Sequence, residues 1–412
     1  MSVTATDVQA RLTEAAQGAL RPATDADAFA GVAPPRFVVS PSTTEQVCAV
    51  LALAHEAGLA VVPRGSGSKL AWGAPPERCD VVLDLTGLDR LVEHTAGDLV
   101  AIAQAGRRLD DLQRDLAEAG QRLAVDPPRG GTVGGLVASA TTGPVRLFAG
   151  PVRDLVIGTT VVRADGVRAK SGGKVVKNVA GYDLGKVLTG SFGTLAVLTE
   201  VAFRLHPLAE SSRWASVPVG STTAAQDVAL RVAHSQLTPS GCELDWRGGS
   251  GVLAIRMDGL VHGVEDRIAA ALDRLGPGAE SSASPPDWWG TEPDGGDVLL
   301  KVTHEAASLG ALLDTVDRAA SAAGADAHTR GSVVVGTVYV SLPATAAPAF
   351  VEQLRGAANR FGGAVVILDA PPEVKEAVDV WGPVRGLELM RRVKEQFDPT
   401  GVLSPGRFVG GI

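Results

Sequence analysis

Apolar residues in the first half of the chain alternate between short continuous runs and the spacing of one helix face. Three continuous runs predict short buried strands at 59–62, 81–85 and 99–103. Before the first run, a helix is expected to begin at a capping box formed by Ser42 and Glu45 and to end at Gly58. Strands and helices that alternate with short connections are typical of an α/β or α+β domain.

The second half of the chain repeats strand and helix patterns after a break at His206-Pro207. Strands are expected at 252–257, 298–303, 333–341 and 364–369, and helices at 264–275, 307–323 and 345–361. Units of this size indicate an antiparallel sheet with helices on one face, as in a separate α+β domain. A last helix is predicted at 387–397, before an ending rich in proline and glycine.

The composition narrows the class of protein. A length of 412 residues accommodates two or three domains, and the 49 glycines cluster at strand ends without a repeating period. A net charge of −8 argues against a nucleic-acid partner. The chain shows no signal-peptide pattern and no apolar stretch long enough to span a membrane. We therefore expect a cytoplasmic protein, which partner proteins could attach peripherally to the inner membrane.

Three cysteines lie far apart in the sequence, at Cys48, Cys79 and Cys242. An iron–sulfur cluster or a structural zinc site needs four ligands, and these thiols match no CxxC spacing. We therefore expect reduced, buried thiols and no metal site.

A glycine-bearing turn after the first strand has the character of an anion site. The turn and the residue after it are Pro63, Arg64, Gly65, Ser66, Gly67, Ser68 and Lys69. Pro63 is expected to end the strand because it has no N–H to donate, and Gly65 and Gly67 are expected to curl the backbone with positive φ. Amide groups in such a curl suit a phosphate, together with the serine hydroxyls and the lysine. By itself, a Gly-Ser turn is more often only a turn.

Three further segments are rich in glycine or unusual in their order of residues. Residues 126–151 are too irregular for a regular element and too apolar for a solvated linker, so we expect backbone wrapped along a buried ligand. A strand at 155–163 and a hairpin turn at Asp165-Gly166 follow it. The other two segments are 172–201 and 397–408. Tight turns explain each segment taken singly, whereas the ordered set is hard to explain in that way.

Taken together, these segments resemble the flavoproteins of the vanillyl-alcohol oxidase type, whose FAD-binding domain is named after p-cresol methylhydroxylase (the PCMH type). The motifs that carry the resemblance are, in order, PRGSG at 63–67, PPRGGTVGGLVAS at 127–139, GYDL…GTL at 181–195 and FDP…PG at 397–406. The resemblance covers residues 35–209 and the C-terminal ending. Within the family, these segments are most similar to the FAD-binding E subunits of bacterial glycolate oxidases.

The resemblance implies an α+β fold with a two-subdomain PCMH-type FAD-binding domain at 35–209. It also implies an α+β cap domain with an antiparallel sheet at 210–385. Residues 1–34 would form an N-terminal segment, and residues 386–412 a C-terminal segment that returns to the FAD domain. The FAD is expected to be non-covalent, because serines (Ser66 and Ser68) stand where relatives with a covalent flavin present a tethering histidine.

Carried over by position, the resemblance implies three groups of FAD contacts. Residues 63–69 would hold the pyrophosphate. The flavin and ribityl chain would be lined by Thr132, Gly134, Gly135, Ser139 and Gly143, and the adenosine end by Gly193, Thr194 and Val197. Lys177 and Tyr182 are further candidates near the flavin, although packing and a buried hydrogen bond explain Tyr182 equally well.

The chain departs from the relatives that oxidise 2-hydroxy acids. Those proteins carry a GDGNxH-like motif and an HGxG segment, which supply metal ligands and a base. Residues 331–342 and 379–390 lack histidine and carboxylate at the corresponding places. Ser404 stands where the family usually has asparagine, which puts one flavin contact in question.

Oxidation of a 2-hydroxy acid at a flavin needs a base for the hydroxyl proton and a cation for the carboxylate. The sequence assigns no catalytic residue. His304 and Arg330 follow or precede predicted strands and are candidates to reach a cleft, and a role as surface polar residues is the alternative.

We therefore expect a non-covalent FAD-binding subunit of a glycolate oxidase-like complex. It would act with a catalytic flavoprotein subunit and an iron–sulfur subunit on a small 2-hydroxy acid such as glycolate. Two alternatives stay open, a stand-alone FAD-dependent 2-hydroxy-acid dehydrogenase and a flavin-free scaffold subunit.

Overall fold

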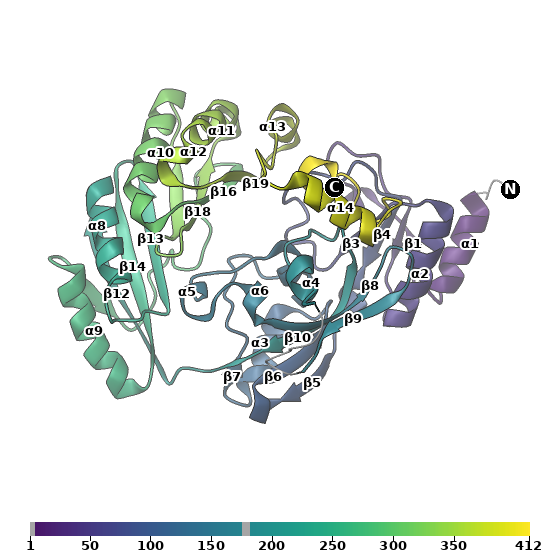
Figure 1. Ribbon diagram of the computed structural model, residues 1–412, viewed down its shortest axis with the longest axis horizontal. Helices are drawn as coiled ribbons and strands as arrows, with labels where there is room; N and C mark the ends of the chain where they lie inside the picture. The colour runs from purple at the N-terminus through teal and green to yellow at the C-terminus, as the bar shows by residue number, and fades with distance from the viewer. Residues whose placement is uncertain (1–4, 175–181) are drawn as a thin grey trace.

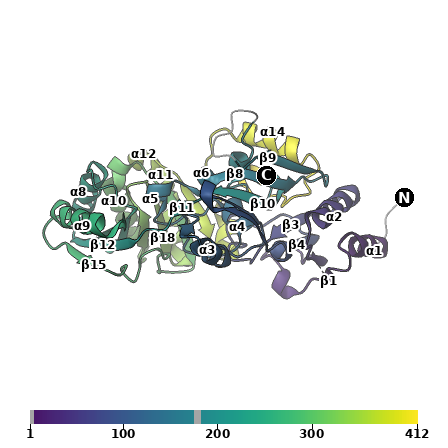
Figure 2. The same ribbon diagram turned by 90° about the horizontal axis from the view of Figure 1, so that it is seen from below.

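The computed structural model describes residues 5–174 and 182–412 (Figure 1). The elements up to residue 207 and the C-terminal helix α14 (Leu387–Phe397) form one half of the molecule. An eight-stranded sheet and its helices form the other half. Figure 2 shows the two halves next to each other along the long axis. The arrangement is the α+β fold that the sequence predicts.

A small, mostly parallel sheet lies at the N-terminal end of the first half. Its strands, in spatial order, are β1 (Leu20–Pro22), β2 (Phe37–Val39), β4 (Val81–Asp84) and β3 (Val61–Arg64). Helices α1 (Ala5–Ala15) and α2 (Thr44–Ala57) pack against it through a shared apolar core. Pro63 lies inside β3 and does not end it, contrary to expectation. The edge position of β3 in this sheet tolerates a residue without an N–H.

Helix α2 begins one residue later than expected. Thr43 is the N-cap, and its hydroxyl accepts a hydrogen bond from the Gln46 amide at 3.2 Å. Gln46 Oε1 in turn accepts from the Thr43 amide, so the capping box is Thr43 with Gln46. The prediction of Ser42 with Glu45 was wrong because both pairs have the spacing of the motif. Gly58 ends the helix in the left-handed conformation, as predicted.

A five-stranded antiparallel sheet forms the second layer of this half. Its strands, in spatial order, are β5 (Leu91–Thr95), β6 (Val100–Gln104), β10 (Val197–Arg204), β8 (Val156–Val162) and β9 (Arg168–Gly172). Gly166 makes the predicted hairpin turn between β8 and β9 with φ 81°. Helices α3 (Leu109–Ala117) and α4 (Val133–Ser139) share an apolar core with this sheet. The two sheets are the two subdomains expected from the resemblance.

The segment 126–151 is more regular than expected. It contains α4 and α5 (Arg146–Ala149), and α6 (Val152–Leu155) follows at once. Thr132 caps α4, since its hydroxyl accepts a hydrogen bond from the Gly135 amide at 3.3 Å. The glycines obscure the helical spacing of three buried residues, which are Val133, Leu136 and Val137.

One eight-stranded antiparallel sheet, here called the large sheet, organises the second half. Its strands, in spatial order, are β15 (Glu280–Ser282), β12 (Ser211–Val219), β14 (Ser250–Gly259), β13 (Gly241–Arg247), β17 (His328–Ser332), β18 (Thr337–Leu342), β16 (Val298–Thr303) and β19 (Val365–Asp369). Helices α8 (Thr222–Ala233), α9 (Val261–Leu275), α10 (Leu309–Ala323) and α11 (Ala347–Gly356) cover its outer face (Figure 1). The remaining short elements are β7 (Gln121–Arg122), α7 (Gly185–Leu188), β11 (His206–Pro207), α12 (Ala358–Phe361) and α13 (Pro372–Ala377).

The strand predicted at 333–341 is correct only in part, since residues 337–341 belong to β18 and residues 333–336 lie before it. The chain forms the hairpin β17–β18 there, and Gly336 (φ 71°) lies in its turn. Strands β12 and β13 and helix α8 were not predicted at all. Several residues of β13 are charged, which weakens the apolar signal on which a strand prediction depends.

The inner face of the large sheet, opposite its helices, is polar. Alternate residues such as Leu244 and Val340 pack beneath the helices, so their neighbours along each strand point the other way. The cross-strand register aligns these neighbours in rows. One row consists of Asp245, Arg330, Tyr339 and Lys301, and the next consists of Glu243, Ser332 and Thr337.

The C-terminal segment returns to the first half. Helix α14 has the predicted bounds, and residues 402–404 then run beside β3. The Val61 amide donates to the Val402 carbonyl at 2.7 Å, and the Ser404 amide donates to the Val61 carbonyl at 2.9 Å. The ending therefore lies next to the turn that follows β3. No helix within 5–174 and 182–412 has both the length and the apolar character to cross a bilayer.

Candidate functional site

A groove in the first half brings together the turn after β3, helix α4, the residues before β10 and the C-terminal segment. It contains about 820 Å³ of empty space, part of it open to solvent. Thirteen of the expected contact residues line it: Pro63, Arg64, Gly65, Ser66, Gly67, Ser68, Lys69, Thr132, Gly134, Gly135, Ser139, Gly193 and Val197. Segments that are far apart in the sequence thus form one concave surface.

The two glycines of the turn are needed for different reasons. Gly67 has φ 78° and open space around it, so its backbone conformation is the reason for a glycine there. Gly65 does not have positive φ, and the expectation for it was wrong in that respect. A Cβ at position 65 would instead overlap the Thr132 side chain, whose Cγ2 would be 3.0 Å away. Gly65 therefore allows the turn to approach the cap of α4.

Lys69 places a cation at the rim of the groove. Its Nζ donates to the Gly130 carbonyl at 2.5 Å, and the Ser68 hydroxyl donates to the same carbonyl at 3.1 Å. Burial and, to a smaller extent, the nearby Arg129 lower the pKa of the Lys69 ammonium to about 8. A bound anion would restore the stability of the charged form.

The Arg64 side chain has a structural role. Its guanidinium donates to Asp27 at 2.8 Å and to Asp84 at 2.9 Å, which joins the turn to the small sheet. The hydrogen bond from Arg21 and then that from Arg64 hold the pKa of the Asp27 carboxyl well below its usual range, while burial alone would raise it. Because the Arg64 guanidinium is paired with these two carboxylates, Arg64 contributes its backbone to the groove and not its charge.

 

The α4 side of the groove is packed closely against the five-stranded sheet. A Cβ on Gly134 would lie 2.9 Å from the Ala105 Cβ, so only a glycine allows this approach. Ser139 donates its hydroxyl to the Gly135 carbonyl at 2.6 Å, within the helix. Backbone and small side chains therefore form this wall.

Two expected contact residues do not line the groove. Gly143 lies against Asp126, where a Cβ would be 2.5 Å from Asp126 Oδ1, and it lines a second cavity described below. Thr194 is buried and donates its hydroxyl to the Ser191 carbonyl at 2.8 Å. Both residues have packing roles in the structure.

Arg407 lines the groove and was not singled out from the sequence. It is 4% exposed, and its guanidinium donates to the Leu70 carbonyl at 2.6 Å. Its Nη1 and the Ser404 hydroxyl are buried without a hydrogen-bond partner among the described residues. Burial lowers the pKa of Arg407 to about 10. The motif at 397–408 indicates that this segment takes part in the site, but it does not show which of its residues points into the groove.

These features fit FAD. A buried cation with an unused N–H, a second cation at Lys69 and a glycine turn suit the two phosphates, which are anionic acceptors. Small residues along α4 leave room for a flat, extended molecule beside the backbone.

The other sequence candidates lie elsewhere. Lys177 is outside the described residues. Tyr182 is 92% exposed and does not line the groove. His304 is buried, with Nδ1 2.9 Å from the Glu305 carbonyl oxygen, and burial lowers its pKa. It lines neither the groove nor the second cavity.

A second, smaller cavity lies between the first half and the inner face of the large sheet. Residues 128 and 142–146 line one side of it, and residues of β13, β17 and β18 line the other. The segment from α4 to α5 thus borders both cavities. Arg330 lines this cavity, as do Arg146, Glu243 and Tyr339.

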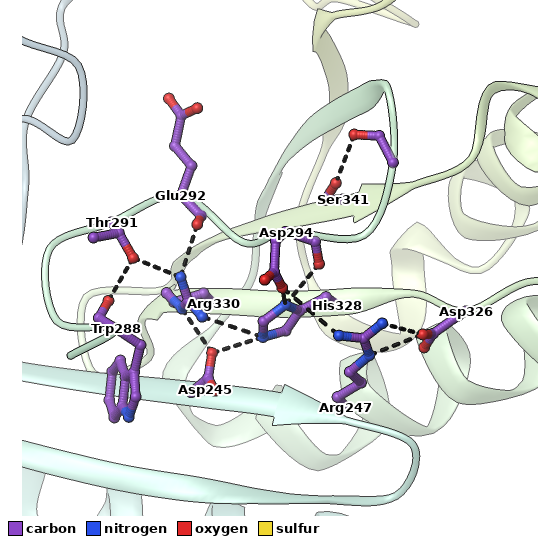
Figure 3. Close-up of polar contacts among 11 residues, drawn as sticks. Asp245, Arg247, Trp288, Thr291, Glu292, Asp294, Asp326, His328, Arg330 and Ser341 are labelled. Carbon is purple, nitrogen blue, oxygen red and sulfur yellow. Dashed lines mark hydrogen bonds and ion pairs between the residues drawn. The ribbon is translucent and has the colours of Figure 1, made fainter. Parts of the chain in front are cut away.

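Arg330 belongs to a network of charged groups on the large sheet (Figure 3). It donates to Asp245 at 2.6 Å and to the Glu292 carbonyl at 2.7 Å. His328 contacts the same Asp245 oxygen at 2.7 Å through Nε2 and Asp294 at 2.6 Å through Nδ1. The network fastens the loop that carries Glu292 and Asp294 to the sheet. Arg330 is therefore buried at a cavity, and the alternative of a surface residue is wrong.

Comparisons with protein families agree with the interpretation of the groove as an FAD site. The model of the FAD binding domain matches residues 35–171, and that of the FAD linked oxidases, C-terminal domain, matches residues 379–408. The chain carries a PCMH-type FAD-binding domain. Both matched ranges contribute to the groove, the first through residues 63–70 and the second through Arg407.

Individual relatives support the same class of protein. An uncharacterized FAD-linked oxidoreductase of Mycobacterium tuberculosis (strain CDC 1551 / Oshkosh) is 27% identical, with 91% of each chain covered. Glycolate oxidase subunit GlcE of Escherichia coli (strain K12) is 35% identical over 52% of this chain and 59% of its own length. The match with GlcE therefore spans little more than half of either protein. The chain is an FAD-linked oxidoreductase.

The fold is also found in a solved structure. The 4-ethylphenol oxidase from Gulosibacter chungangensis, in its isoeugenol complex, superposes with a TM-score of 0.70 at 16% identity. The superposition covers 98% of this chain and 97% of the oxidase. The likeness concerns the fold of both halves of the molecule.

Proposed function

We propose that this chain holds FAD non-covalently in the groove and serves as a subunit of a glycolate oxidase-like complex. The observation that carries the proposal is the set of unused polar groups in the groove, above all Arg407 Nη1 beside the glycine turn. Serines at positions 66 and 68 offer no group for a covalent bond to the flavin. The likeness to GlcE supports membership of such a complex.

The proposed partners are a catalytic flavoprotein subunit and an iron–sulfur subunit, and the substrate of the complex is a small 2-hydroxy acid such as glycolate. FAD supplies the two-electron acceptor when bound. The cysteines of this chain suit no cluster of its own, since Cys79 and Cys242 are buried and burial raises the pKa of both thiols. A place in the cytoplasm, with attachment to the inner membrane only through partners, belongs to the same proposal.

A second candidate is substrate oxidation by this chain itself. The observation that favours it is the second cavity, where Arg146 and Arg330 face a carboxyl group, Glu243. Arginines are suited to hold a carboxylate, and the cavity shares the segment 142–146 with the region beside the groove. Here the residues of this chain would bind and orient the substrate.

Purification alone and together with the proposed partners tests both functions. The flavin absorbance of the purified chain, released by denaturation without a covalent adduct, is the expected result. Failure to retain FAD, and to regain it from added FAD, contradicts the first proposal. Reduction of the bound flavin by glycolate in the isolated chain would establish the second candidate, whereas reduction only with partners present would favour the first.

A further inference from the structure

Glu243 is a buried carboxyl group at the boundary between the two halves. It lies on β13, opposite Ser332 of β17, and Ser332 in turn lies opposite Thr337 of β18. Its side chain belongs to the inner face of the large sheet and lines the second cavity. Only 5% of the residue is exposed, so the carboxyl group can reach a molecule bound in the cavity but little bulk solvent.

Two other carboxylates close to this cavity are held by cations. Asp245 accepts from Arg330 and lies 2.7 Å from His328 Nε2 (Figure 3). Glu292 accepts from Arg129 at 2.9 Å. Glu243 instead shares a hydrogen bond with the Ser332 hydroxyl, and it is the one carboxyl group among the described residues that line the cavity. Among the described residues, no direct ion pair therefore lowers the pKa of the Glu243 carboxyl group.

The surroundings favour the protonated form of Glu243. Burial raises the pKa of Glu243 to about 8, although the hydrogen bond with Ser332 acts in the opposite direction. Asp126 raises it further, while Arg146 and Arg330 lower it. Tyr339 lies nearby on β18, and burial raises its pKa to about 12, so it adds no negative charge near neutral pH. A carboxyl group of this kind gains and loses its proton near neutral pH, as a proton-transfer group must.

Cations in the same place fit the other end of an anionic substrate. Arg146 reaches over the sheet, with Nη1 3.4 Å from Thr337 Oγ1. Lys301 lies opposite Tyr339 in the cross-strand register, and burial lowers its pKa to about 8. A carboxylate that binds beside these cations offsets the free-energy cost of burying their charge. The cavity thus offers cations for an anion and one carboxyl group for a proton.

We propose that Glu243 accepts the hydroxyl proton of a small 2-hydroxy acid whose carboxylate is held by Arg146 in the second cavity. The inference rests on the second candidate function, substrate oxidation by this chain itself, and assigns the base that this function needs. In the step, the hydroxyl O–H bond breaks and its proton passes to the Glu243 carboxylate. The C2–H bond breaks, its hydrogen and electron pair pass as hydride to FAD, and the C2–O double bond forms. The hydroxy acid is oxidised to the 2-oxo acid, and FAD is reduced by two electrons.

The proposal predicts opposite pH dependences for reaction and for binding. Proton acceptance needs the carboxylate, so flavin reduction should accelerate as the pH rises through the pKa of Glu243. An inert anion such as oxalate is repelled by that carboxylate, so its affinity should fall over the same pH range. A group with only a packing role would produce neither change.

The test uses the FAD-loaded full chain and three variants. Rapid-mixing measurements of flavin reduction by glycolate and by D-lactate should show a rate that falls about 100-fold or more in Glu243→Gln and no longer rises with pH. Ser332→Ala should keep the reaction but move its pH profile upward, because the lost hydrogen bond lowered the pKa. Glu280→Gln, on the exposed edge strand β15 of the same sheet, should behave as the parent protein.

A second measurement needs no turnover. Infrared difference spectra recorded during a pH titration should contain a protonated-carboxyl band that disappears near pH 8 and that is absent in Glu243→Gln. Oxalate binding, followed by flavin absorbance, should lose its pH dependence in the same variant.

The outcomes separate this inference from the proposed function. A chain that never binds FAD contradicts the proposed function. A chain that binds FAD and is reduced with the same profile in Glu243→Gln contradicts the role of Glu243 alone. A chain that binds FAD but is reduced by neither hydroxy acid contradicts the second candidate function, and the role of Glu243 with it. If Glu243→Gln does not fold, an unchanged profile in Ser332→Ala or an absent carboxyl band in the parent protein overturns the inference.

Discussion

Gly65 and Thr132 lie so close together that a Cβ at position 65 would be 3.1 Å from the Thr132 Cβ and would overlap its hydroxyl. The contact joins the turn after β3 to the cap of α4, and both elements form the groove. The width of the groove at this point therefore depends on the absence of one methyl group.

Gly65→Ala should reduce the affinity for FAD by about 10-fold or more, because the turn must move away from Thr132 to admit the methyl group. Flavin fluorescence during titration of the FAD-free chain measures this loss. Gly97→Ala is the matched control, since a Cβ there meets nothing within 4 Å and its backbone does not need a glycine. Equal affinities in the two variants would contradict the role of the contact.

Arg407→Gln should weaken FAD binding by about 10-fold to 100-fold, as expected for the loss of a charge-assisted hydrogen bond to a phosphate or another acceptor. Calorimetric titration with FAD measures the change. Arg391→Gln provides the control, because Arg391 is exposed and pairs with Glu388 on the same helix. The hydrogen bonds of Arg407 with the Leu70 and Trp72 carbonyls also hold the C-terminal segment, so the melting temperature should be recorded in parallel.

His328 should make the stability of the large sheet depend on pH. Burial alone would lower the pKa of His328, but the hydrogen bonds with Asp245 and Asp294 raise it above its usual value. A raised pKa in the folded state stabilises the protein below the ordinary histidine pKa, and the stabilisation is lost as the pH rises through the folded-state pKa.

His328→Gln should therefore remove about 1 to 2 kcal/mol of unfolding free energy at mildly acidic pH and much less at alkaline pH. Denaturant unfolding at several pH values measures the difference between the variant and the parent protein. His234→Gln, at an exposed position at the end of α8, is the control. A difference that is the same at every pH would show that His328 is not charged in the folded protein.

Arg129 joins the two halves of the molecule. Its guanidinium pairs with Glu292 at 2.9 Å and with Asp369 at 2.8 Å, both of which belong to the second half. Arg129→Gln should loosen the loop that carries Glu292, and amide hydrogen exchange around residue 292 should accelerate several-fold, while the core of the large sheet stays protected. Arg108→Gln, whose side chain is exposed, should leave exchange in that loop unchanged.

The sequence predicted the position of the groove well because its wall is made of local motifs. Gly67 lies in a turn whose composition alone indicates positive φ, and the C-terminal helix has the predicted bounds. The reason for Gly65 could not be predicted, since it depends on a contact with a residue 67 positions away. Local composition shows where a chain turns but not what the turn touches.

The second cavity was beyond prediction for the same reason. Glu243 lies on a strand that the pattern did not reveal, and its partner Ser332 is 89 positions away. Arg330 was considered as a candidate, but only the cross-strand register places it beside Asp245. A motif at 331–342 cannot reveal a carboxyl group that lies on another strand.

The return of residues 402–404 to β3 has a consequence for how the cofactor is acquired. Arg407, which closes one side of the groove, is synthesised about 200 residues after the last groove residues of β10. A growing chain that has exposed only the first half lacks this wall. The complete wall of the groove therefore forms only after the large sheet and Arg407 have been synthesised.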